Sequence, residues 1–133
     1  MASILLIDDD HDFRMITAQV LRQAGHTVSE APDGKTGLKL YHAGAYDLII
    51  TDMAMPDMDG VELMVGLQHT APRPRVIAIS GGSRFSNPVY LPMAKKLGAQ
   101  RALQKPFRPE ELLQAVAEVL AEPAPPTVPR PGK

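Results

Sequence analysis

Hydrophobic residues along the chain form short apolar runs, separated by segments with helical spacing. Five runs, several of them rich in valine and isoleucine, lie near residues 3–7, 27–31, 47–51, 75–79 and 102–104. Short apolar runs of this kind are typical of buried strands. Strands that alternate with helices favour a parallel sheet. We therefore predict an α/β domain with a doubly wound, five-stranded parallel sheet and helices on both faces.

The segments between the runs predict the helices. Apolar residues recur every three or four positions from Phe13 to Ala24, before Gly25, and again from Leu38 to Tyr41 and from Val61 to Leu67. Pro88 and Pro92 restrict the fourth helix to roughly 90–97, with Gly98 as its end. The last helix is expected to begin near Pro109, with Glu110 and Glu111 at its positive end.

Composition narrows the class of protein. The chain has 133 residues, of which 44% are hydrophobic and 22% charged, as in one globular domain. It has no cysteine, which excludes disulfides, thiolate zinc sites, iron–sulfur clusters and cysteine nucleophiles. The apolar run at 4–7 meets three aspartates at once, so neither a signal peptide nor a membrane span fits. We expect a cytoplasmic protein without a membrane partner.

Charge is unevenly distributed along the chain. The net charge is only −1, so the chain lacks the excess of basic residues that is typical of nucleic-acid-binding domains, and we expect no nucleic-acid partner. Residues 1–60 carry ten acidic and four basic side chains, and they hold every aspartate in the chain. From residue 122 the composition changes to a segment with five prolines, at 123, 125, 126, 129 and 131. We predict a folded domain over 1–121 and a disordered proline-rich tail or linker over 122–133.

Polar residues follow four of the five predicted strands. They are Asp8 and Asp9 after the first strand, Asp52 after the third, Ser80 after the fourth and Lys105 after the fifth. Parallel strands of a doubly wound sheet bind ligands outside their carboxyl ends, so these groups are expected to converge. Crowded carboxylates repel unless a cation joins them, and oxygen ligands favour a hard ion. The pattern indicates a site for a divalent metal, for which a hard ion such as Mg²⁺ is suited.

Each of these residues also has an ordinary structural explanation. The acidic run from Asp8 to Asp12 suits the start of the first helix, with Asp12 as the expected cap. Asp52 alone could be a turn residue, and a single lysine such as Lys105 is usually a surface residue. Their joint occurrence at successive strand ends is what favours a functional site.

At these residues the sequence resembles the receiver domain of bacterial two-component response regulators, over about residues 2–121. The resemblance rests on four motifs: Leu6-Ile7-Asp8-Asp9-Asp10, the segment from Asp52 to Gly60, Ile79-Ser80-Gly81-Gly82, and Lys105-Pro106-Phe107. It implies the flavodoxin-like strand order 2-1-3-4-5. It also implies partners, namely a histidine kinase or a histidine phosphotransfer protein upstream and an output protein downstream.

The resemblance implies a role for each site residue. Asp52 would be the phosphoacceptor. Asp9, Asp52 and the backbone carbonyl of Ala54 would bind Mg²⁺ directly, and Asp8 would act on it through water. Ser80 and Lys105 would hold phosphoryl oxygens, and the peptide bond between Lys105 and Pro106 would be cis.

The chain departs from the family pattern in two places. The aromatic residue that the family commonly has on the fifth strand, three positions before the lysine, is Ala102 here. The segment 81–88 after Ser80 is long and contains two glycines. We therefore expect a switch that acts through Ser80 and this segment, with Phe85 filling the space of the missing ring.

We weigh two main function hypotheses, since a third, a binding module that uses the fold without phosphorylation, is disfavoured by the acidic pair, Asp52, Ser80 and Lys105. The principal one is a stand-alone, Mg²⁺-dependent receiver that signals through a changed partner-binding surface and is not an enzyme in the usual sense, since its only chemistry is its own phosphorylation and dephosphorylation. The alternative is a Mg²⁺-dependent phosphatase with an aspartyl nucleophile, because Asp8-x-Asp10 resembles the haloacid-dehalogenase motif. That motif expects Thr or Val two residues after Asp10, where this chain has Asp12.

Overall fold

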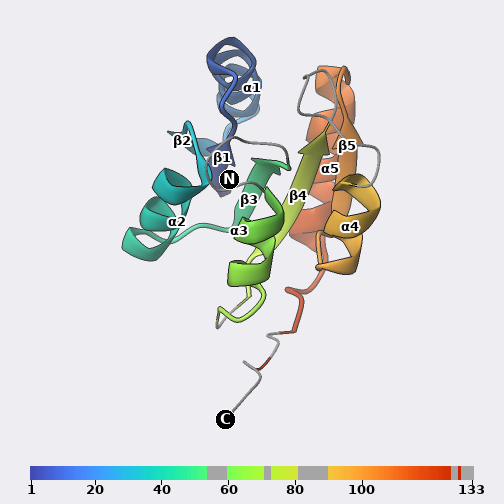
Figure 1. Ribbon diagram of the computed structural model, residues 1–133. Helices are drawn as coiled ribbons and strands as arrows, with labels where there is room; N and C mark the ends of the chain where they lie inside the picture. Colours follow the sequence, from blue (N-terminus) through green and yellow to red (C-terminus); the bar gives the residue numbers. More distant parts are fainter. Residues whose placement is uncertain (54–59, 71–72, 81–89, 127–128, 130–133) are drawn as a thin grey trace.

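The computed structural model describes residues 1–53, 60–70, 73–80, 90–126 and 129, in which five strands alternate with five helices (Figure 1). The elements are β1 Ser3–Ile7, α1 His11–Gln23, β2 Thr27–Ala31, α2 Gly34–Ala43, β3 Leu48–Asp52, α3 Gly60–Leu67, β4 Arg75–Ser80, α4 Tyr90–Lys96, β5 Arg101–Gln104 and α5 Pro109–Ala121. Each strand predicted from an apolar run is present, within one residue at either end.

The five strands form one parallel sheet in the order β2-β1-β3-β4-β5, as expected. In the register of β3 and β4, Asp52 pairs with Ile79, and in that of β4 and β5, Ser80 pairs with Gln104. Ser80 therefore lies one residue beyond the partner of Asp52, and Lys105 follows the partner of Ser80. The sheet topology thus brings the carboxyl ends of β3, β4 and β5 to one edge.

Helices cover both faces of the sheet (Figure 1). One core cluster joins side chains of β1 such as Ile4 and Leu6 to Leu21 of α1 and Leu112 of α5. The other joins the alternate side chains of the sheet to α2, α3 and α4. Because side chains alternate across a strand, uninterrupted apolar runs such as β1 and β3 supply both cores at once.

The cap of α1 differs from our expectation. We expected Asp12, but the N-cap is Asp10, whose carboxylate Oδ1 accepts a hydrogen bond of 3.1 Å from the backbone N–H of Phe13. Asp10 has the extended backbone that a cap requires, whereas Asp12 already lies in the first helical turn. Asp12 there interacts favourably with the positive end of the helix instead.

The chain after α5 is hydrogen-bonded to the sheet at its start. Arg75 of β4 donates from Nε and Nη2 to the carbonyl of Glu122, at 3.0 and 2.9 Å. Further along, Gln100 donates to the carbonyl of Pro123 and Arg73 to that of Pro126, both at exposed positions. Glu122 therefore ends the helix against β4, while Pro123 and Pro126 accept hydrogen bonds at exposed positions.

We expect removal of residues 123–133 to leave the domain intact. It deletes two exposed hydrogen bonds to described residues and spares Glu122, so the melting temperature should fall by less than about 3 °C. Differential scanning calorimetry of the full and shortened chains measures this. A drop of several degrees would show that the tail packs on the domain.

Candidate functional site

The first strand ends in two acidic residues with different surroundings. Asp8 is completely buried, its N–H donates to the carbonyl of Ala31, and its Oδ1 accepts a 2.9 Å hydrogen bond from the N–H of Asp10. Arg14 of α1 donates to the backbone carbonyl of Asp8 at 2.8 Å, and this hydrogen bond stabilises the turn between β1 and α1. Asp9, one residue further along, is exposed. The turn thus holds one carboxylate inside the domain and one at its surface.

The other site residues lie at the ends of neighbouring strands. Asp52 closes β3 and Ser80 closes β4, and both are only 3% exposed. The N–H of Lys105 donates to the carbonyl of Ser80 at 2.7 Å, so the lysine continues the pairing of β5 with β4. The peptide bond between Lys105 and Pro106 is cis, as the family resemblance implied.

These residues come together as the sequence indicated. Oxygen atoms of Asp8, Asp9 and Asp52 all lie within 4.8 Å of one another. The Lys105 ammonium reaches into the same group, with Nζ 3.1 Å from Oδ2 of Asp8 and 3.3 Å from Oδ2 of Asp52. Ser80 is placed beside them by the strand register. Ala54, whose carbonyl was expected to complete the metal site, lies outside the described residues, as do the 81–88 segment and Phe85.

The cluster is electrostatically strained without a cation. Burial raises the pKa of Asp8 to about 6, and the neighbouring charge of Asp52 adds to this, whereas the N–H of Asp10 and the ammonium of Lys105 oppose it. Burial lowers the pKa of Lys105, but the carboxylates of Asp52 and Asp8 outweigh that effect, so its pKa is raised overall. Lys105 therefore stays charged, and it only partly compensates the three carboxylates.

The donor set fits a hard divalent ion. It consists of carboxylate oxygens on three residues, which is the ligand chemistry that Mg²⁺ prefers. Oδ2 of Asp8 is buried and makes no hydrogen bond to the described residues, having only the ammonium beside it. A cation bound at the cluster would add positive charge near this buried oxygen. Asp8, Asp9 and Asp52 are thus suited to hold the ion.

Two further residues at the site are identified from the structure. Phe13 fits the helical spacing of apolar residues in α1, and its ring centroid lies 4.0 Å from Nζ of Lys105. Arg14 donates to the carbonyl of Asp8. Their positions, four and five residues after Asp9, are the one hint, since the first turn of α1 starts at the acidic edge of the sheet.

A family model for the response regulator receiver domain matches residues 4–117. The chain belongs to this family. Receiver domains are signalling domains of two-component systems, so the match favours the receiver hypothesis over the aspartyl phosphatase. Among the described residues, no helix is long and apolar enough to span a membrane.

Individual proteins agree with the family. The chain is 34% identical over 125 residues to the DNA-binding transcriptional regulator NtrC of Azospirillum brasilense, covering 94% of this chain and 25% of that protein. The receiver domain of NtrX from Brucella abortus superposes with a TM-score of 0.83 at 27% identity, covering 90% and 99% of the two chains. Chemotaxis protein CheY4 of Vibrio cholerae superposes with a TM-score of 0.77 at 31% identity, covering 90% of this chain and 98% of that chain.

The two kinds of relative differ in length. This chain spans 12% to 25% of the first curated relatives that it matches, but almost the whole of the isolated receiver structures. The shared part is the receiver domain itself. Activities that the longer proteins' names describe, such as DNA binding, therefore belong to those proteins.

Proposed function

We propose that this receiver domain accepts a phosphoryl group on Asp52 from a histidine kinase or a histidine phosphotransfer protein, in a Mg²⁺-dependent reaction. The supporting observation is the ammonium of Lys105, which lies 3.3 Å from Oδ2 of Asp52 inside a group of three carboxylates. A phosphoryl group on Asp52 would enter a space that already has a fixed positive charge.

Each residue has a chemical task in this proposal. A carboxylate oxygen of Asp52 attacks phosphorus in line with the leaving group, so an O–P bond forms as the P–N bond to the donor imidazole breaks. When bound, the ion would supply positive charge that neutralises the transferring group, and Asp8, Asp9, Asp52 and the carbonyl of Ala54 are the groups that would hold it. Lys105 would add its own positive charge beside the phosphoryl oxygens.

Ser80 is suited to respond once the acyl phosphate has formed. The new group adds negative charge beside existing carboxylates, so the phosphorylated state needs a further hydrogen-bond donor. The hydroxyl of Ser80 is at the next strand end and would bind a phosphoryl oxygen. Its movement would shift the segment that follows β4, and so couple the site to the α4, β5 and α5 surface.

Intact-mass spectrometry with acetyl phosphate tests this proposal. The wild-type protein is expected to gain the mass of one phosphoryl group in the presence of Mg²⁺ and little in its absence. Asp9→Ala removes an exposed carboxylate ligand but leaves Asp52, so it should lose most of the Mg²⁺ dependence, with a slower gain of mass. Equal labelling with and without Mg²⁺ would contradict the metal assignment.

Three further expectations from the sequence also stay predictions. A stand-alone role is one, because the first curated relatives are longer than this chain. The absence of a nucleic-acid partner is another, since the similar NtrC protein is named a DNA-binding regulator. The cytoplasmic location is the third, and it agrees with the family's place in two-component signalling.

A further inference from the structure

We propose that Phe13 is a positioning residue for phosphoryl transfer, acting on Lys105 through a cation–π contact. The proposal rests on the function proposed above and adds a residue to that site. Nζ of Lys105 lies 4.0 Å from the centroid of the Phe13 ring, within the distance at which an ammonium is attracted to an aromatic face. The ammonium of Lys105 thus has the ring and the two carboxylates of Asp8 and Asp52 as neighbours.

The ring has a property that the carboxylates lack. When Asp52 becomes an acyl phosphate, one of its oxygens is bonded to phosphorus, and the ion pair with Lys105 at 3.3 Å is altered. The phenyl ring does not ionise, is no metal ligand and forms no bond to phosphate. Its attraction for the ammonium is therefore the same before and after transfer, and it keeps Lys105 at the site while its anionic partners change.

Phe13 is itself held by two specific contacts. Its backbone N–H donates to the N-cap Asp10, which fixes the residue at the start of α1. Its ring meets that of Phe107 edge to face, with centroids 5.6 Å apart and planes at 89°. Phe107 comes two residues after Lys105 in the chain, so α1 and the segment leading into α5 jointly set where the ring lies.

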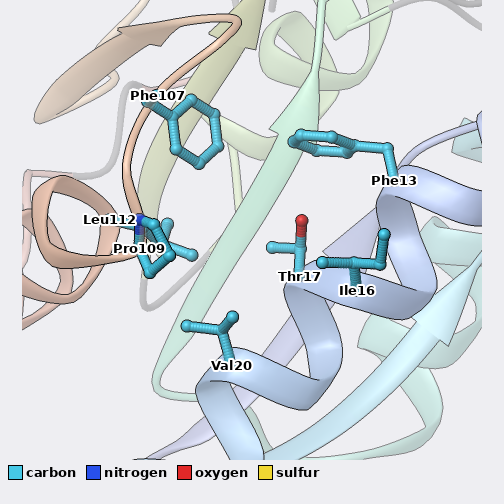
Figure 2. Close-up of a pocket in the computed structure, with 7 residues that line it drawn as sticks. All are labelled: Phe13, Ile16, Thr17, Val20, Phe107, Pro109 and Leu112. Atoms are coloured by element: carbon cyan, nitrogen blue, oxygen red, sulfur yellow. The ribbon is translucent and has the colours of Figure 1, made fainter.

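The ring is not enclosed by dense packing. Beside it is a pocket of about 110 Å³ lined by Phe13, Ile16, Thr17, Val20, Phe107, Pro109 and Leu112 (Figure 2). Figure 2 shows the two rings at one end of this pocket and Val20 at the other. A smaller residue at position 13 also loses the contact with Phe107, so an effect on phosphorylation has to be separated from an effect on folding by control variants.

The decisive variant is Phe13→Leu, which keeps an apolar side chain and removes the aromatic face. We expect the rate of phosphorylation by acetyl phosphate at saturating Mg²⁺ to fall roughly three- to tenfold, which lies within the range expected for an ammonium–aromatic contact. Phe13→Tyr keeps the face and should restore the rate. Val20→Ala removes apolar surface from the same pocket two helical turns away and should leave the rate unchanged.

A double-mutant comparison tests the route through Lys105. In a Lys105→Gln background, which has no ammonium, Phe13→Leu should cause no further loss of rate. A separate readout needs no phosphorylation: protons next to Nζ of Lys105 lie near the ring face, so their NMR signals should be shifted upfield in the wild type and in Phe13→Tyr but not in Phe13→Leu.

The outcomes distinguish the two proposals. If the wild-type protein gains no phosphoryl group, both the proposed function and the role of Phe13 are overturned. If the wild type is phosphorylated and Phe13→Leu reacts at the same rate, the positioning role alone fails. A rate loss that persists unchanged in the Lys105→Gln background also overturns it, because the ring would then act by a route other than the ammonium.

Discussion

Replacing Asp52 by asparagine is expected to abolish the gain of one phosphoryl mass on treatment with acetyl phosphate and Mg²⁺. The substitution keeps the shape of the side chain but removes the nucleophilic carboxylate and one of the three grouped acidic residues. Asp52 is only 3% exposed and lies at the end of β3, within 3.3 Å of Lys105. Asp8 is the other buried carboxylate beside Lys105 among the described residues, and the family resemblance assigns the phosphoryl group to Asp52.

A matched control is Asp47→Asn. Asp47 precedes β3, and its Oδ2 accepts a 2.8 Å hydrogen bond from the N–H of Ser3, at the opposite end of the strand from Asp52. This variant should be labelled like the wild type, since it makes the same chemical change away from the site. Undiminished labelling of Asp52→Asn, or labelling lost equally in both variants, would contradict the assignment of Asp52 as acceptor.

The fold was predictable because its main determinant is local. Runs such as 3–7 and 48–52 have apolar side chains on both faces, which is the pattern of a strand covered by helices on two sides. Once the strands are parallel, the residue after each strand lies at one edge of the sheet. Asp8, Asp52, Ser80 and Lys105 could therefore be grouped from the sequence although they are far apart in the chain.

What could not be predicted depends on rotamers and on the exact first turn of a helix. Asp10 and Asp12 are both good caps by composition, and only the backbone at the start of α1 decides between them. The spacing of Phe13 fits the core-facing side of the helix, so nothing in the pattern shows that its ring faces an ammonium. Contacts between side chains of different elements, such as Arg14 with the carbonyl of Asp8, leave no periodic signal.

Replacing Asp8 by asparagine is expected to stabilise the metal-free protein at neutral pH. In the folded protein the pKa of Asp8 is raised from 3.8 to about 6, mainly by burial. Below pH 3.8 the carboxyl is protonated in the folded and unfolded states alike. Between pH 3.8 and 6 the unfolded chain has released its proton while the folded one retains it, so stability falls as pH rises. Above pH 6 both states have released the proton, and the free energy of unfolding falls no further through this group.

The size of this effect follows from the shift in pKa. The free energy of unfolding of the wild type is lowered on the order of 2 to 3 kcal/mol at pH 7, or roughly 5 to 10 °C in melting temperature. The neutral amide of Asp8→Asn avoids this loss of stability. Thermal unfolding in a chelator at pH 4 and at pH 7 measures it. The variant and the wild type should melt close together at pH 4, and the variant should melt higher at pH 7.

The comparison separates burial of Asp8 from its attraction to Lys105. Asp9→Asn is the control, because it makes the same chemical change at an exposed residue of the same turn. Mg²⁺ should raise the melting temperature of the wild type at pH 7 and narrow its gap to Asp8→Asn, since an ion that binds only the folded state stabilises it. If Asp8→Asn instead melts lower than the wild type at pH 7 in chelator, the ion pair with Lys105 at 3.1 Å outweighs the penalty of burial. The cluster would then be a stabilising ion pair rather than a strained site completed by a cation.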